Sequence, residues 1–79
     1  MSRAASVVEA IAKALADRPD SVRVTERESR GQTFIELNMA PGDMGRVIGR
    51  QGRTAQAVRS LASLAGEIDG VRVSVDFRD

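Results

Sequence analysis

The segment that decides the fold of this 79-residue chain is Val47-Ile48-Gly49-Arg50-Gln51-Gly52-Arg53-Thr54. Its two glycines, three positions apart, separate two stretches with the apolar spacing of amphipathic helices. Because glycine has no side chain, the backbone amides of such a loop can come close to a phosphate. The second helix begins directly after the loop, so its unpaired N–H groups point toward the same place. The segment therefore predicts contact with a nucleic-acid backbone, RNA above all.

Positive charge is concentrated around this loop. The formal net charge is only +1, but residues 44–66 contain no acidic residue and four arginines, namely Arg46, Arg50, Arg53 and Arg59. The rest of the chain has eight basic and eleven acidic residues, a net charge of −3. A local basic patch on a nearly neutral protein indicates a polyanionic partner. An arginine-rich helix face in contact with solvent is the alternative interpretation.

Upstream of the loop, the apolar pattern predicts one helix and two strands. A helix reaching about residue 17 follows from three- and four-residue spacings of Val7, Val8, Ile11 and Leu15. Alternation of apolar and polar residues predicts strands around residues 22–25 and 35–39, and the polar run 26–32, which contains Gly31, predicts the hairpin turn between them.

Downstream, the pattern predicts two helices and a third strand. Pro41 is suited to the first position of a short helix, with Asp43 in its first turn, an apolar stripe of Met44, Val47 and Ile48, and an end at Gly49. Thr54 is the expected N-cap of a longer helix that ends at about Gly66. Ala57, Val58, Leu61, Leu64 and Ala65 share one side of this longer helix, and with Ala55 and Ala62 the expected apolar side spans roughly half of its circumference. Gly70 introduces a strand with alternating apolar residues Val71, Val73, Val75 and Phe77.

The expected order of elements is therefore α-β-β-α-α-β. Three strands with one apolar face each need a cover, and three amphipathic helices supply it. The fold class is α+β: a two-layer sandwich in which a three-stranded sheet is covered on one face by three helices. A chain of this length is expected to form one domain over residues 1–79.

The motif Ile48-Gly49-Arg50-Gln51-Gly52 between two helices resembles the I-G-x-x-G core of the KH domain, and the chain order is similar to the type II form. With the longer run over residues 45–54, the chain resembles the small single-KH bacterial RNA-binding proteins of the KhpA family. The resemblance implies a groove for about four single-stranded nucleotides. It places Gly49, Arg50, Gln51 and Gly52 in a backbone clamp, Ile48 on the groove floor and Arg53 beside the RNA backbone. Charge and helical phase add Arg46 and Arg59.

Alternatives remain for individual residues. The loop can be a tight helix–helix turn in which Gly49 is only a C-cap. Ile48 belongs to the apolar stripe of its helix, which favours a core position over direct base contact. Phe77 shares the phase of the core valines, whereas Phe34 has the opposite phase to Ile35 and is expected to be exposed or packed at an edge. With only these two rings, a stacking platform of the RRM or OB type is not expected.

The leading function is single-stranded RNA binding, as an RNA chaperone or post-transcriptional regulator. The resemblance implies a homodimer, or a heterodimer with a KH- and R3H-containing partner of the KhpB/Jag type, and a link to cell elongation and division. A protein-interaction or assembly module with a vestigial groove is the alternative. No histidine or cysteine is present and no nucleophile–base pair is visible, so neither an enzyme nor a metal or other cofactor is expected. Without a long apolar run, the expectation is a soluble cytoplasmic protein with no membrane insertion.

Overall fold

Residues 1–78 are described by the computed structural model, and their elements follow the predicted order. The elements are α1 (Arg3–Leu15), β1 (Arg23–Ser29), β2 (Gln32–Asn38), α2 (Met44–Ile48), α3 (Arg53–Ile68) and β3 (Arg72–Arg78). Two short 3-10 turns, η1 (Pro19–Ser21) and η2 (Arg50–Gly52), lie between them. The α+β class and the element order are thereby confirmed.

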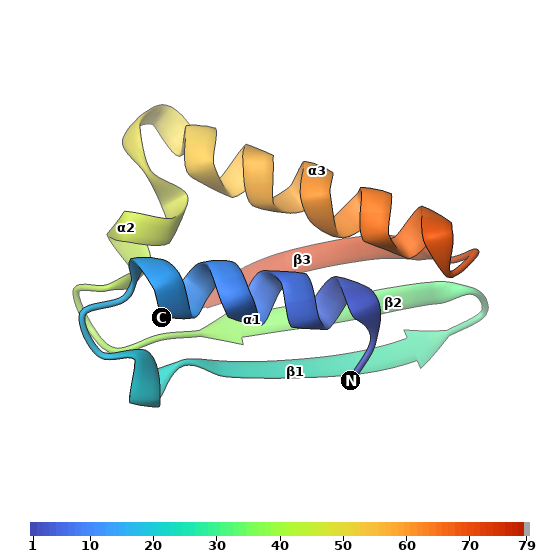
Figure 1. Ribbon diagram of the computed structural model, residues 1–79, viewed down its shortest axis with the longest axis horizontal. Coiled ribbons are helices and arrows are strands. Elements are labelled where there is room, and N and C mark those ends of the chain that lie inside the picture. Colours follow the sequence, from blue (N-terminus) through green and yellow to red (C-terminus); the bar gives the residue numbers. More distant parts are fainter. Residues whose placement is uncertain (79) are drawn as a thin grey trace.

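The three strands form one sheet in the order β1-β2-β3. β1 and β2 are antiparallel and β2 and β3 are parallel. Phe34 of β2 pairs with Arg27 on one side and Ser74 on the other. All three helices lie on the same face of this sheet (Figure 1). Along β2, fully buried residues alternate with half-buried ones, because every second side chain points toward the helices.

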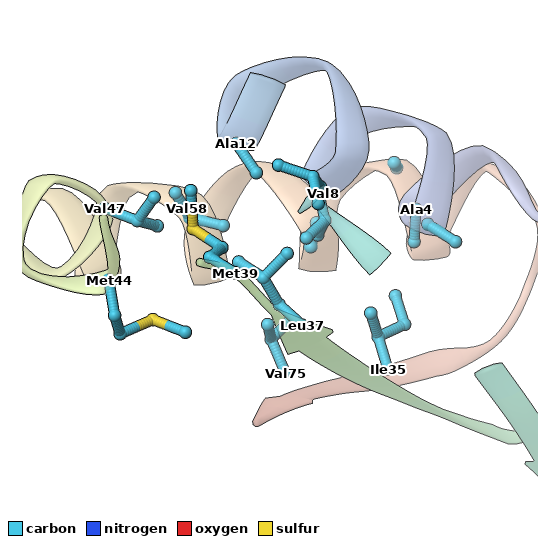
Figure 2. Close-up of a cluster of buried hydrophobic side chains, with 14 residues drawn as sticks. Ala4, Val8, Ala12, Ile35, Leu37, Met39, Met44, Val47, Val58 and Val75 are labelled. Carbon is cyan, nitrogen blue, oxygen red and sulfur yellow. The ribbon is translucent and has the colours of Figure 1, made fainter. Parts of the chain in front are cut away.

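The core fills the space between the helices and β2. Its largest fully buried apolar side chains are Ile35, Leu37, Val8, Val47 and Val58. Figure 2 shows them converging from both layers, together with Met39, Met44 and Val75. The helices contribute mainly small residues, since the buried positions of α1 are Ala4, Ala5, Val8 and Ala12. Small side chains allow α1 and α3 to pack close to each other and to the sheet.

The hairpin turn is much shorter than predicted. β1 continues to Ser29 and β2 begins at Gln32, so the turn consists of Arg30 and Gly31 alone, with φ angles of 52° and 77°. Positive φ at both positions suits the tight two-residue turns that match the twist of paired strands. The polar residues 26–29 are strand residues because one face and one edge of β1 are open to solvent.

α2 begins at Met44, so the prediction that Pro41 is its first residue was wrong. Pro41 and Gly42 lie in a turn closed by the Asp43 N–H, which donates to the carbonyl of Ala40 at 3.0 Å. Asp43 is the residue before the helix, but its carboxylate makes no capping bond. It is buried and accepts the backbone N–H of Arg18 at 3.0 Å, which ties the start of α2 to the segment after α1.

Both predicted ends of α3 were wrong. The helix begins at Arg53 after Gly52, and Thr54 lies inside its first turn, where no side chain caps the helix. At the other end, α3 continues to Ile68, and Gly66 is a buried residue inside it. A Cβ at Gly66 would collide with the side chain of Val73 and lie 2.9 Å from the carbonyl oxygen of Val71. Glycine is therefore required here by close helix–strand packing, not by a helix end.

The buried side of α3 is also different from the predicted one. Of the predicted apolar side, only Ala55, Val58, Ala62 and Ala65 are buried, and Gly66 joins them in the core. Leu61 is 48% exposed and Leu64 is 57% exposed, and Ala57 is exposed as well. The helix presents its small residues to the sheet because only they fit the short distance between the two layers.

Candidate functional site

The loop between α2 and α3 has a backbone conformation that requires its glycines. Gly49 has φ 74° and ψ 176°, a region open essentially to glycine alone. Gly52 is left-handed, with φ 72° and ψ 14°, and Gln51 between them has φ 58°. A Cβ at Gly49 would also lie 2.8 Å from Cβ of Thr54. Gly49 thus ends α2 and Gly52 precedes α3, and together they reverse the chain within four residues.

This reversal leaves backbone donors at the surface. The N–H of Gly49 donates to Gly45 at 2.9 Å, and that of Gly52 donates to Gly49 at 3.2 Å. Between them, the N–H groups of Arg50 and Gln51 have no hydrogen-bond acceptor within residues 1–78. The loop projects at one end of the molecule, where no other segment covers it (Figure 1). The two free donors therefore face solvent at the start of α3, where the helix dipole favours an anion.

The side chains of the loop add positive charge. Arg50, Gln51 and Arg53 are all exposed, and neither arginine has an acidic partner among the described residues. The guanidinium of Arg53 donates to the side-chain oxygen of Gln51 at 3.1 Å. The neutral Gln51 therefore orients Arg53 beside the free backbone donors, and Arg50 is left unpaired.

A groove of about 540 Å³ starts at this loop and lies between α3 and β3. Its lining consists of Ile48, Gln51, Gly52, Ala55, Gln56, Arg59, Asp76 and Phe77. The structure thus brings four of the predicted site residues together on one groove: Ile48, Gln51, Gly52 and Arg59. The preference for a core position at Ile48 was wrong, because this side chain is 37% exposed and the buried residues of α2 are Met44 and Val47.

Arg59 is held across the groove by contacts with both of its walls. Its Nε donates to the backbone carbonyl of Val75 at 3.4 Å, and Nη1 donates to Gln56 at 3.3 Å. Its guanidinium carbon lies 4.8 Å from the centre of the Phe77 ring. Phe77 is half-buried: it packs against the core and also lines the groove. The alternation of apolar and polar residues in β3 predicted that Phe77 packs against the core, but not that it lines the groove.

Three acidic residues change the electrostatics predicted from the sequence. Arg46 does not line the groove, because its guanidinium pairs with Asp17 at 2.8 Å and with Asp43 at 3.9 Å. Asp76, far from the loop in sequence, does line it. Its carboxylate accepts Nε of Arg78 at 2.8 Å, and this bond raises the pKa of Arg78 above its usual value. Asp76 therefore reaches the groove with its charge partly balanced.

The described part of the chain contains neither a candidate metal site nor a candidate membrane-spanning helix. Residues 1–78 contain no group of three or more acidic, histidine or cysteine side chains that could hold a metal ion. Within the same residues, no helix combines the length and the apolar character that crossing a membrane requires.

The fold agrees with the comparisons to known proteins. The family model described as "KhpA/KhpB, KH domain" matches residues 5–77. "RNA-binding protein KhpA" of Halalkalibacterium halodurans is 49% identical over 74 residues, which cover 94% of this chain and 97% of that protein. The proteins of the same name in Caldanaerobacter subterraneus and Aquifex aeolicus are 50% and 43% identical, over 90% and 98% of this chain and 95% and 98% of their own lengths. With such a match over nearly its whole length, this chain belongs to the KhpA/KhpB family of KH domains.

Proposed function

We propose that this protein binds single-stranded RNA and acts in the cytoplasm as an RNA chaperone or post-transcriptional regulator, with residues 1–79 forming a single KH domain. The observation that carries the proposal is the open glycine loop, with two free N–H donors and two unpaired arginines at the head of a groove. Relatives that match nearly the whole chain carry the name RNA-binding protein.

The proposed binding mode divides the nucleotide between the loop and the groove. The backbone N–H groups of Arg50 and Gln51 donate to a phosphate, and the guanidiniums of Arg50 and Arg53 neutralise it. The bases lie in the groove on the apolar surfaces of Ile48 and Phe77. The guanidinium of Arg59, already fixed against Phe77, contacts the next phosphate or a base edge. Arg46 has no direct part in this mode, because two carboxylates already surround it.

A variant of the loop tests this mode. In Arg50→Asp/Gln51→Asp, one carboxylate replaces the Arg50 guanidinium and a second is added beside the backbone donors, so that both repel a phosphate. Both positions are exposed, so the fold should persist. We expect affinity for a single-stranded tetranucleotide to fall at least tenfold, since charge-assisted hydrogen bonds each contribute about 1.5–3 kcal/mol. Ser29→Asp/Arg30→Asp is the matched control: it changes the net charge equally, at the hairpin at the opposite end of the molecule (Figure 1).

The salt dependence of binding separates RNA recognition from the scaffold alternative. Three phosphate contacts predict a slope of roughly −2 in a plot of log affinity against log salt concentration. If the loop variant binds as the wild type does and the slope is flat, the groove is not a backbone site, and an assembly module becomes the better description.

The exposed apolar residues of α3 favour a second chain as a partner. Ala57, Leu61, Leu64 and Ile68 follow one another at spacings of four, three and four residues, as in the seam of a coiled coil. The last three are 48%, 57% and 66% exposed. We propose that this stripe packs against a second copy of the chain or the KH domain of a KhpB/Jag-like protein. Two grooves in one assembly would raise the effective RNA concentration at each of them.

The partner proposal is tested by the mass of the protein in solution. Leu61→Asp places a charge in the centre of the stripe and should convert a dimer to a monomer in light scattering. Ser60→Asp, one position away on the same helix but outside the stripe, should leave the mass unchanged. Equal masses for both variants and the wild type would exclude this face as the self-association surface.

A further inference from the structure

The face of the sheet that no helix covers carries an ordered set of polar side chains. The register places every second residue of each strand on this face, in four rows across the sheet. From the hairpin end, the rows are Ser29-Gln32-Arg72, Arg27-Phe34-Ser74, Thr25-Glu36-Asp76 and Arg23-Asn38-Arg78. Phe34 is the one aromatic side chain in these rows, and it is half-buried.

A cavity of about 370 Å³ lies in the middle of this face. Its lining includes Arg27, Phe34, Glu36, Asp76 and Arg78. This volume is within the range of small-molecule sites, about 300–1,000 Å³. The guanidinium carbon of Arg27 lies 4.5 Å from the centre of the Phe34 ring, so the two groups form one stacked unit. The outer plane of a guanidinium is a surface on which nucleobases stack.

The charges around the cavity are arranged in two zones. In the middle, Glu36 and Asp76 share Arg78, whose Nε lies 3.5 and 2.8 Å from their carboxylates. At least one carboxylate oxygen of this trio is therefore free to accept a further hydrogen bond. Outside the lining of the cavity, Arg23 and Arg72 occupy opposite corners of the face, and neither pairs with an acidic side chain within residues 1–78, although Arg23 donates to the backbone carbonyls of Asp20 and Val22. The carboxylate oxygens in the middle of the face can accept hydrogen bonds from the edge of a base, and the arginines at its corners can attract the phosphates on either side.

We propose that this uncovered face is a second nucleotide site, which takes a base that carries an exocyclic amino group. The base stacks on Arg27 above Phe34 and donates its amino group to the carboxylates of Glu36 or Asp76, as cytosine N4 donates to acidic side chains in base recognition. Cytosine, adenine and guanine fit this site. Uracil presents a carbonyl oxygen in place of the amino group and is disfavoured beside a carboxylate.

The site is placed to receive the same RNA strand as the groove, and in this respect it rests on the proposed function. Asp76 lines both the groove and the cavity, because β3 is an edge strand with the groove on one side and the uncovered face on the other. The groove holds about four nucleotides. A longer strand that leaves it over the free edge of β3 reaches the cavity at Asp76 and Ser74.

The test compares short and long oligonucleotides on variants of the uncovered face. Arg27→Gln removes the stacking plane from an exposed position, and we expect it to weaken binding of an oligocytidine dodecamer roughly five- to tenfold, the effect of losing one stacked base. Binding of an oligocytidine tetramer should not change, because the groove alone holds it. Arg3→Gln is the control: it removes the same charge from the helical face and should change the affinity for neither the dodecamer nor the tetramer. Glu36→Gln should reduce the preference for the cytidine dodecamer over the uridine dodecamer, since an amide can donate as well as accept.

The results of these measurements distinguish the second site on the uncovered face from the RNA site proposed in the groove. The loop variant Arg50→Asp/Gln51→Asp should weaken both lengths, whereas Arg27→Gln should weaken the dodecamer alone. If the loop variant has no effect but Arg27→Gln still weakens the dodecamer, the groove proposal fails and the second site stands. If Arg27→Gln and Glu36→Gln bind the dodecamers as the wild type does, the second site is excluded. A change in molecular mass without a change in affinity would identify the face as a protein interface and would also overturn the proposal.

Discussion

The two glycines of the loop should differ in how much stability their replacement costs. Gly49 and Gly52 both have positive φ, but their surroundings differ. Gly49 combines φ 74° with ψ 176° and has the side chain of Thr54 against the position of a Cβ. Gly52 is in the ordinary left-handed region, and nothing lies within 4 Å of the position of its Cβ.

The magnitudes follow from these two differences. At Gly52, alanine meets only the penalty of the left-handed region, about 1–2 kcal/mol. At Gly49, the backbone region itself costs about 1–3 kcal/mol, and forcing a methyl group against Thr54 adds about 1–3 kcal/mol. After partial relaxation we expect Gly49→Ala to lower the free energy of unfolding by roughly 2–4 kcal/mol, a substantial part of the total for a domain of this size.

Urea denaturation followed by circular dichroism measures both values. A double-mutant cycle isolates the contact, because Thr54→Gly removes the side chain that the new methyl group would meet. The double variant Gly49→Ala/Thr54→Gly should lose less stability than the sum of the two single variants. The reasoning is refuted if Gly52→Ala is as destabilising as Gly49→Ala, or if the cycle shows no coupling.

Three further effects follow from other contacts. Gly66→Ala should destabilise by about 1–2 kcal/mol because its methyl group would meet Val73, whereas Gly45→Ala, with open space around it, should be neutral or gain up to about 1 kcal/mol in urea denaturation. Ser2→Ala removes the side chain that accepts the first-turn N–H of α1 and should lower the free energy of unfolding by about 1 kcal/mol; a loss no larger than that of an exposed serine control would contradict this. Hydrogen bonds from Ser2 lower the pKa of Glu26 below its usual value of 4.5, so this carboxylate stabilises the fold above pH 4.5 and ceases to do so as the pH falls through its lowered pKa. Thermal unfolding of Glu26→Gln should therefore differ from the wild type at pH 7 and converge with it in acid.

The sequence was sufficient for the fold class because its periodicities are regular. Alternation over residues 35–39 and 71–77 and the helical spacing around Val8 predict strands and helices without tertiary information. The loop was predictable as well, because two glycines between amphipathic helices, with arginines beside them, indicate a sharp and open chain reversal. Element ends were less predictable, since a cap such as Thr54 competes with a neighbouring glycine that reverses the chain more sharply.

What the sequence could not determine is the position of α3 above the sheet. Apolar residues surround much of this helix, and its wheel alone favours the leucine side over the alanine side. Only the contact of Gly66 with Val73 shows that the helix lies close enough to exclude leucine. The β3 side of the groove could not be predicted for a similar reason. Asp76 and Phe77 line the groove because β3 pairs with β2, and this pairing joins residues that are distant in sequence.

The topology of the sheet has a consequence for the order of assembly. β2 joins β1 through a two-residue turn, whereas its other neighbour, β3, is separated from it in sequence by α2 and α3. Contacts that span little sequence form fastest, so the hairpin is expected early and the docking of β3 late. The groove between α3 and β3 does not exist until β3 has docked. A chain in which β3 has not yet docked can therefore display the glycine bend, yet it lacks one wall of the groove that begins there.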